Sequence, residues 1–418
     1  MSPEVSAERR RKTGRTLPEG GTVRLFTNHR EALFSRRPNR FLIIAQDGNE
    51  EIPCHCPNPG RLVEFVFPGA RLILEQRRPL PPEPGAPLRS PPPRAKTGWT
   101  AAGIYYRDGV APLFSSRANK AAEVLILKKI IPGLREIHRE FTLGASRFDF
   151  LCIDGKGNRH LVEVKACSLI EYGVAMFPDA PSSRALKHLE ELAALRAEGY
   201  SCHVLFVIVH GNPRVFIPNL HTDPAFAAAL SRYGSTGDRP GVKIHAALLC
   251  CNREGTAILT SAAVPVDLSH GKLAESNRGN YLILLKIPEP TEISAGSLGP
   301  RLYAPGWYVY TGSAQKNLST RINRHLRKIR KQKHWHLDYL TPYAETIKAL
   351  PILSYRNLEC SLAKALADLG GRAVPGFGSS DCRCESHLYY FADPPMGNRA
   401  FVDLLLRFRH EEGLKREV

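Results

Sequence analysis

The fold of the central part of this chain is decided by two short stretches, SRFDFL at residues 146–151 and VEVK at residues 162–165. Both alternate apolar and polar residues, which predicts strands over 147–153 and 160–166. The turn residues between them, at 155–158, predict that the two strands form a hairpin.

Side chains alternate between the two faces of a strand. We therefore expect Asp149 on one face of the first strand, with Phe148 and Phe150 on the other. In the second strand Glu163 and Lys165 share a face. Folding the hairpin can then bring Asp149 beside Glu163 and Lys165.

Two carboxylates that approach closely repel each other unless a divalent cation lies between them. Oxygen ligands that hold Mg²⁺ or Mn²⁺, with a lysine nearby, suit the hydrolysis of a phosphodiester. For an isolated pattern of Asp149, Glu163 and Lys165, an ordinary salt bridge on a hairpin face is the commoner outcome. The residues around the hairpin decide between the two interpretations.

The hairpin lies within a longer chain that we divide by composition and turn signals. The expected parts are a disordered basic arm (1–20), a small β-barrel (21–97) with a proline-rich insertion (79–94), a mixed α/β core (98–265), a linker (266–276), a third unit (277–395) and a C-terminal helix or tail (396–418). This predicts an α+β multidomain protein.

Further elements are expected within these parts. Strands are predicted at 41–45, 62–67, 71–74, 204–209, 281–287 and 306–310, and helices at 119–131, from the Ser182/Ser183 cap onward, at 318–333 and at 357–369. In the helix at 318–333, Leu318, Ile322, Leu326 and Ile329 predict one apolar face.

Basic residues outnumber acidic ones by 58 to 40, which gives a net charge of +18 and favours a polyanionic partner. Between Ile293 and Leu337 the sequence has no acidic residue but several basic ones. No apolar run reaches the length of a membrane span, and the basic N-terminal cluster is not followed by an apolar signal segment. We expect a cytoplasmic protein that binds nucleic acid and no membrane.

The hairpin and its flanks resemble the SfsA (sugar fermentation stimulation protein A) family over about residues 23–265. The resemblance is carried by RPNRFL (37–42), HCPNPGR (55–61), SRFDFL (146–151), VEVK (162–165), FPDA (177–180) and KHL (187–189). It implies an OB-like barrel, a PD-(D/E)XK nuclease-like core, DNA binding and nuclease activity. The family's threonine-rich turn and Arg-Gly before KHL appear here as Ser182 to Ala185.

Catalytic roles then fall to Asp149, Glu163 and Lys165, and Glu140 is a further candidate metal ligand. The positions expected to contact nucleic acid are Arg36, Arg37, Arg40, Arg61, Arg147, Arg184, Lys187 and His188. OB barrels bind nucleic acid in a basic groove with stacking surfaces. Ordinary surface or helix-capping roles remain open for Glu140, Arg184, Lys187 and His188.

Residues 277–392 resemble the GIY-YIG nuclease superfamily, and more closely its domain of unknown function 123 family. YVYTGSA (308–314), the segment 321–325, WHLDYL (335–340), Glu359-Cys360 and GFGSSDC (376–382) carry the match. It implies roles for Tyr281 or Tyr310, Arg321 and Glu359 (as a metal ligand), with His325 in support. Arg324, Arg327 and Lys328 would contact nucleic acid. The interval between Tyr281 and Tyr310 is long and requires a hairpin insertion, so a non-catalytic DNA-binding module is an alternative.

Cys382, Cys384 and His387, with His336 as a possible fourth member, could be zinc ligands. Cys-x-Cys…His is a weaker pattern than paired Cys-x-x-Cys motifs, so zinc is not expected and a buried structural turn is favoured. The expected cofactor is Mg²⁺ or Mn²⁺.

Together these features predict a metal-dependent nuclease of the SfsA type with an appended GIY-YIG-like domain. One alternative is a non-catalytic DNA-binding regulator of sugar (maltose) metabolism that retains nuclease folds. Another is an RNA-processing or RNA-binding factor. The resemblance favours DNA over RNA, although a basic surface would serve either.

Overall fold

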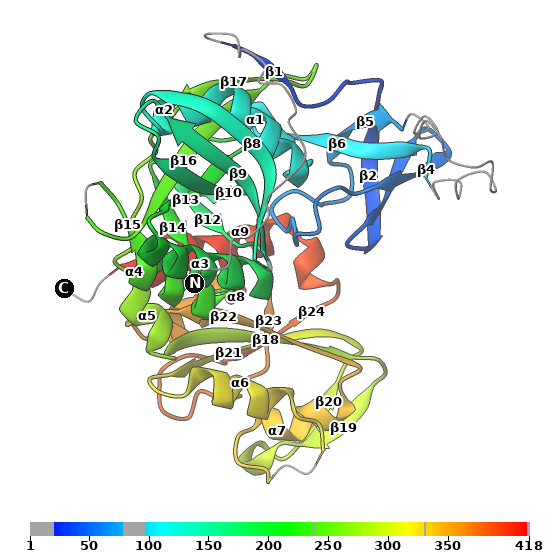
Figure 1. The fold of residues 1–418 in the computed structure, drawn as a ribbon. Coiled ribbons are helices and arrows are strands. Elements are labelled where there is room, and N and C mark those ends of the chain that lie inside the picture. Colours follow the sequence, from blue (N-terminus) through cyan, green and yellow to red (C-terminus); the bar gives the residue numbers. More distant parts are fainter. Residues whose placement is uncertain (1–20, 78–96, 145, 238, 330–331, 416–418) are drawn as a thin grey trace.

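The computed structural model describes residues 21–77, 97–144, 146–237, 239–329 and 332–415, and the chain forms three domains in contact with one another (Figure 1). The predicted basic arm 1–20 and the proline-rich segment 79–94 lie outside the described residues. No helix in the described part of the chain combines the length and apolar character that a membrane span requires.

The N-terminal domain is a closed five-stranded barrel. Its strands are β2 (Arg30–Asn39), β3 (Leu42–Asp47), β4 (Glu50–His55), β5 (Arg71–Gln76) and β6 (Trp99–Tyr106). Antiparallel pairing runs in the order β4-β3-β2-β5-β6, and parallel pairing of Cys54 with Trp99 closes the barrel between β4 and β6. This is the strand order of an OB fold, as expected.

The strand predicted at 62–67 is wrong: this segment forms turns. Leu62 has a φ of 53°, outside the extended region, while Leu62 and Phe65 are both buried in the barrel core. Apolar residues that plug a barrel produce the same sequence pattern as a short strand.

The central sheet continues from the barrel. It contains β7 (Gly109–Pro112), β16 (Val242–Cys251), β13 (Ser201–Ile208), β10 (Arg159–Cys167), β9 (Ser146–Asp154) and β8 (Leu134–Leu143), with β17 (Thr256–Ser261) and β1 (Val23–Arg24) at one end. β8, β9 and β10 are antiparallel, whereas β10, β13 and β16 are parallel. The predicted hairpin is β9–β10, and the predicted strand at 204–209 is β13.

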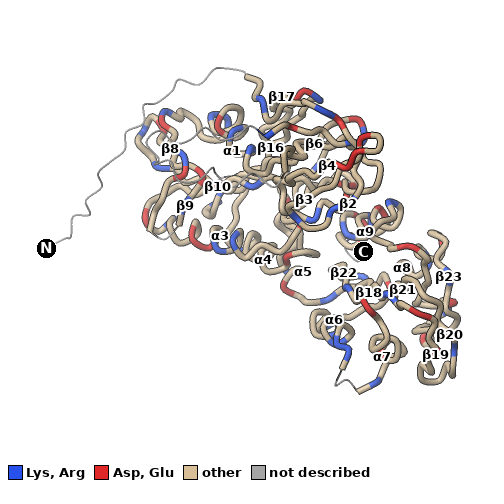
Figure 2. The backbone as a smooth tube through the Cα atoms, turned by 90° about the vertical axis from the view of Figure 1, so that its right-hand side faces the viewer, with Lys and Arg blue, Asp and Glu red and all other residues tan. Residues whose placement is uncertain are grey.

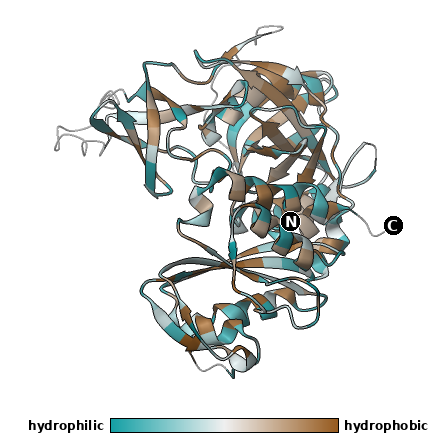
Figure 3. Cartoon of the chain, turned by 180° about the vertical axis from the view of Figure 1, so that it is seen from behind, coloured by the Kyte–Doolittle hydropathy of each residue, from teal (hydrophilic) through white to brown (hydrophobic). Residues whose placement is uncertain are grey.

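Helices cover both faces of this sheet, and the strands between them are apolar (Figure 3). On one face lie α1 (Ala118–Ala121), a π-helical turn (Ala122–Ile126) and α2 (Leu127–Ile130). On the other lie α3 (Ser183–Leu195) and α4 (Pro224–Tyr233). The Ser182 hydroxyl accepts a hydrogen bond from the Ala185 amide at 3.2 Å, which is the N-cap predicted for α3.

The C-terminal domain has a five-stranded sheet in the order β22-β18-β21-β24-β23. Its strands are β18 (Gly279–Ile287), β21 (Gly306–Ala314), β22 (Thr346–Leu353), β23 (Arg372–Ala373) and β24 (Leu388–Phe391). Its helices are α6 (Leu318–Leu326), α7 (Leu337–Leu340), α8 (Glu359–Asp368) and α9 (Arg399–His410). The expected insertion between Tyr281 and Tyr310 is the hairpin β19 (Thr291–Ser294) and β20 (Pro300–Tyr303).

The basic helix predicted at 318–333 is shorter than expected. It ends at Leu326, because Arg327 is extended with a ψ of 125°. Leu318 and Ile322 are buried as the apolar pattern predicts, but Ile329 is 74% exposed. The apolar repeat therefore continues for one turn beyond the helix.

The segment expected to be a linker packs as part of the structure. Residues 271–275 form α5 (Gly271–Glu275), which contacts α4, and Leu273 and Ala274 are buried. Leu273 shares a core cluster with Phe67 of the barrel and Tyr281 of the C-terminal domain.

Helix α9 contacts both other domains. The His221 ring accepts from the Leu353 amide at 2.9 Å and its other nitrogen donates to the Arg409 carbonyl at 2.7 Å. The Arg399 guanidinium donates to the Tyr106 hydroxyl at 3.1 Å. The barrel, the core and the C-terminal domain are therefore packed as one body.

Candidate functional site

The β9–β10 hairpin is irregular at Asp149. The ladder runs from Arg159 paired with Ile153 to Val162 paired with Phe150, where it ends. Beyond that point one Asp149 carboxylate oxygen accepts a hydrogen bond from the Val164 amide at 2.7 Å. Asp149 thus takes the place of a backbone partner at the open end of the ladder.

Strand alternation is broken at the same point, so the expected face of Phe148 is wrong. Phe148 packs in the cluster that contains Leu151 and Leu161, while Phe150 packs with Val162 in the cluster on the other face. The neighbouring strand β8 is also distorted here, because Glu140 has a φ of 53°. Regular alternation would have kept Phe148 and Phe150 together.

Asp149 is held by a residue that the sequence did not single out. Its second oxygen accepts a hydrogen bond from the Asn119 amide group on α1 at 2.7 Å. Burial raises the pKa of Asp149, and the nearby charge of Glu163 raises it further. Both effects reflect a carboxylate that has lost water and faces a like charge.

Glu163 lies at the centre of the site and is only 3% exposed. One carboxylate oxygen accepts from Lys165 Nζ at 2.5 Å and from His188 Nδ1 at 2.6 Å. Burial alone would raise the pKa of Glu163, but the His188 hydrogen bond and the Lys165 charge outweigh it and lower the pKa. Glu163 is therefore a buried, charged carboxylate.

The other oxygen of Glu163, Oε2, is buried and has no hydrogen-bond partner among the described residues. Buried carboxylate oxygens are rarely left without a partner. An orphaned oxygen beside a second carboxylate fits a divalent cation with oxygen ligands. Asp149 and Glu163 are the residues that would hold it.

Glu140, expected as a further metal ligand, does not join these two carboxylates. Its side chain is 72% exposed and lies 3.8 Å from Arg147. Within the described part of the chain, no cluster of three or more potential metal ligands includes Glu140, Asp149 or Glu163. Glu140 lies on the distorted strand β8 and is at the surface instead.

The residues expected to contact nucleic acid divide into two groups. Arg36, Arg40, Arg61, Arg147, Arg184 and Lys187 are exposed, and Arg36 pairs with Glu51. Arg37 instead donates hydrogen bonds to the carbonyls of Arg40, Asn58, Gly60 and Arg61, so its guanidinium braces the barrel. His188 is 7% exposed, and its Nδ1 forms a hydrogen bond with Glu163.

In the C-terminal domain the predicted residues also converge. The Tyr281 hydroxyl lies 3.0 Å from His325 Nε2, and the rings of Tyr281 and Tyr310 are 6.5 Å apart. Arg321 donates to the Ser313 carbonyl at 2.7 Å, and the Ser313 hydroxyl donates to Glu359 Oε2 at 2.6 Å. Burial raises the pKa values of both tyrosines.

Two basic side chains of this domain are committed to internal contacts. Arg324 donates to both oxygens of Asp338, at 3.1 and 2.8 Å, and lies over the Trp335 ring. Lys328 donates to the Ala344 carbonyl at 2.6 Å. Arg327 remains exposed, and Figure 2 shows basic residues along α6.

The structure brings Cys382, Cys384 and His387 together and adds Cys360 from α8. His336 is not part of this cluster; it accepts a hydrogen bond from the Gly378 amide at 3.1 Å. Cys360 was missed as a ligand because it lies far upstream in the sequence and only the fold places it beside the others.

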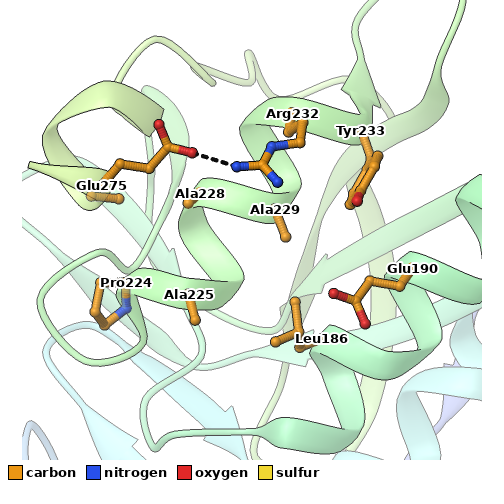
Figure 4. A pocket seen from close by; sticks show the side chains of 10 residues that line it. Leu186, Glu190, Pro224, Ala225, Ala228, Ala229, Arg232, Tyr233 and Glu275 are labelled. Carbon is orange, nitrogen blue, oxygen red and sulfur yellow. Dashed lines mark hydrogen bonds and ion pairs between the residues drawn. The ribbon is translucent and has the colours of Figure 1, made fainter.

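A separate hollow of about 400 Å³ lies between α3, α4 and α5 (Figure 4). Small side chains such as Ala225 and Ala229 form its wall, and the ion pair of Arg232 with Glu275, at 2.7 Å, closes one side. None of the catalytic candidates lines it. The hollow is distinct from both candidate centres.

Three family models match the chain. The "SfsA N-terminal OB domain" matches residues 36–111, the "Sugar fermentation stimulation protein RE domain" residues 116–254, and "Domain of unknown function DUF123" residues 280–409. These matches confirm both resemblances and the expected fold class.

Relatives of known name cover the first two domains. A sugar fermentation stimulation protein homolog of Pyrobaculum neutrophilum is 34% identical over 237 residues, which make up 56% of this chain and 93% of the relative. One of Desulfitobacterium hafniense strain Y51 is 36% identical over 247 residues, 59% of this chain and 99% of the relative. A solved structure of Pyrococcus furiosus SfsA in complex with Ca²⁺ is 28% identical, covers 59% of this chain and 99% of that one, and has a TM-score of 0.48.

Proposed function

The chain belongs to the sugar fermentation stimulation protein family, and we propose that it binds nucleic acid and hydrolyses phosphodiester bonds with a divalent metal. The observation that supports this most directly is the orphaned, buried oxygen of Glu163 beside Asp149. A protein that only binds phosphates gains nothing from two buried carboxylates, because both repel its ligand.

Asp149 and Glu163 would hold Mg²⁺ or Mn²⁺, which supplies charge stabilisation to the phosphate and lowers the pKa of a water molecule. Lys165, which contacts Glu163 at 2.5 Å, supplies a positive charge at the phosphate. His188 and Asn119 fix the orientation of the two carboxylates through the hydrogen bonds described above.

The barrel provides the binding surface in this proposal. Arg40 lies over the ring of Phe41 at 4.8 Å, and Phe41 is 49% exposed. An exposed aromatic ring beside guanidinium groups is the kind of surface on which bases stack and phosphates bind. Arg147, Arg184 and Lys187 are further exposed basic residues, on the core domain.

The C-terminal domain offers a second candidate centre, because Tyr281, Arg321 and Glu359 meet there. Both oxygens of Glu359 have neighbours: Ser313 at 2.6 Å and His387 at 3.0 Å. In the core site, by contrast, Glu163 Oε2 has no hydrogen-bond partner among the described residues. We therefore assign hydrolysis to the core site and nucleic-acid contact to the C-terminal domain.

The test uses the full chain with supercoiled plasmid, single-stranded DNA and RNA, each with Mg²⁺, Mn²⁺ or EDTA. Wild type should cut with metal and not with EDTA, and Glu163→Gln and Asp149→Asn should bind the substrate but lose cutting by at least about 100-fold. Glu198→Gln, an exposed change after α3, is the matched control.

Other results would replace the proposal. Binding without cutting under any metal would favour the DNA-binding regulator of sugar metabolism. Cutting of RNA alone would favour the RNA-processing factor. If Glu359→Ala abolishes cutting while Glu163→Gln does not, hydrolysis belongs to the C-terminal domain.

A further inference from the structure

Four potential metal ligands meet in the C-terminal domain, away from the core site. The Sγ atoms of Cys360, Cys382 and Cys384 and a ring nitrogen of His387 all lie within 4.8 Å of one another. Cys360 is the second residue of α8, and His387 immediately precedes β24. This is the only such cluster within the described ranges.

The spacing suits a tetrahedral metal ion. Zinc bonds of about 2.3 Å to sulfur and about 2.0 Å to nitrogen place neighbouring ligand atoms about 3.5–3.8 Å apart. His387 Nε2 lies 3.4 Å from Cys382 Sγ and 4.0 Å from Cys360 Sγ. These two separations are close to the edge lengths of that tetrahedron.

The donor set selects the kind of metal. Three thiolates and one imidazole are soft and borderline ligands, which suit Zn²⁺ and do not suit Mg²⁺ or Ca²⁺. Four protein ligands leave no open position for water, which is the arrangement of structural zinc sites.

The surroundings hold His387 in the orientation that this requires. Its Nδ1 lies 3.0 Å from Glu359 Oε1, within ion-pair distance although not aligned as a hydrogen bond, and this leaves Nε2 on the cysteine side. Its backbone amide donates to Phe377 at 2.8 Å, and its carbonyl accepts from Thr311 at 2.9 Å. A carboxylate behind a ligating histidine is a common feature of zinc sites.

We propose that Cys360, Cys382, Cys384 and His387 bind one Zn²⁺ in a closed structural site that joins the 376–388 loop to the first turn of α8. The site also fixes Glu359, which lies between His387 and Ser313. Zinc would thereby set the geometry of the C-terminal centre without taking part in its chemistry. This inference does not depend on nuclease activity in the core.

The first test measures the metal content of the full-length chain by mass spectrometry after purification without chelators. We expect about one zinc per chain in wild type and in Cys250→Ser, which changes an exposed cysteine outside the cluster. Cys360→Ser and His387→Ala should both fall to background. His387→Cys should retain zinc, because four thiolates also form structural zinc sites.

A second measurement separates ligand loss from misfolding. In zinc-loaded wild type, Cys250 is the exposed thiol left to react with a thiol reagent, and a strong chelator should expose three more. Cobalt substitution should give the thiolate charge-transfer and visible bands of tetrahedral coordination. The proposal fails if the chain is zinc-free and these thiols react equally before and after zinc is added, or if two of them form a disulfide.

Discussion

Acidification from pH 7 to pH 4.5 should loosen the central sheet, because three histidines cross it side by side. His160 Nδ1 lies 3.1 Å from His203 Nε2, and His203 Nδ1 lies 3.0 Å from His245 Nε2. They belong to the parallel strands β10, β13 and β16, in which each histidine lies two residues beyond the partner of the previous one, because His160 pairs with Ser201 and His203 pairs with Lys243. Each contact requires a nitrogen that accepts a proton and one that donates it, so the chain of rings must stay largely neutral.

The magnitude follows from the pKa values. Burial lowers the pKa of His245 from 6.5 to about 4, with help from the Lys243 charge, and lowers that of His203 well below its usual value. Above pH 6.5 these histidines bind no proton in either the folded or the unfolded chain, so they do not lower the free energy of unfolding. Between pH 6.5 and about pH 4 the unfolded chain binds more protons at these positions than the folded chain does. The free energy of unfolding therefore falls by about 3 kcal/mol for His245 alone.

Hydrogen–deuterium exchange of peptides from β13 and β16, corrected for intrinsic rates, measures this locally. In wild type the free energy of local opening of these strands should fall by up to about 3 kcal/mol between pH 7 and pH 4.5. In His245→Gln it should fall by clearly less. His138→Gln, on exposed β8, should behave like wild type. Protection that does not change over this range, or that changes equally in wild type and His245→Gln, would show that the histidines do not set this stability.

Three further changes test other contacts. Glu64 is buried with no hydrogen-bond partner among the described residues, and burial followed by the Asp179 charge raises its pKa. Glu64→Gln should therefore raise the melting temperature at pH 7. The gain should shrink toward pH 4.5, where the glutamate of the unfolded chain is also protonated. Asn119→Ala removes the hydrogen bond to Asp149 and should lower the free energy of unfolding by about 1–3 kcal/mol. It should also weaken Mn²⁺ binding measured by calorimetry, and a wild-type affinity would contradict the role of Asn119 in orienting Asp149. Gly60→Ala would place a methyl group 2.1 Å from Asp179 Oδ2 and should destabilise the chain by about 1–3 kcal/mol in denaturant titration, whereas Gly98→Ala, with open space around it, should not.

Local patterns predicted the elements that depend on local chemistry. The β9–β10 hairpin follows from alternation and a turn, and α3 follows from the Ser182 cap. The same rules failed where tertiary contacts override them. Phe148 leaves its expected face because the ladder ends at Phe150 and β8 is distorted at Glu140. The turns at 62–67 fill a barrel rather than extend it.

The two candidate sites also contain some residues that local sequence patterns predicted and others that they did not. The Asp149, Glu163 and Lys165 grouping could be expected because the residues share a hairpin. Asn119 and Cys360 could not, since each is brought to its site by a helix that packs from a distant part of the chain. A sequence pattern reports neighbours along one element, whereas these partners are set by how elements pack.

The third domain covers an apolar face of the other two domains. Here that domain buries Phe67, Leu169, Leu220 and Leu273 in a shared core. A chain that lacked the third domain would expose these apolar side chains to water.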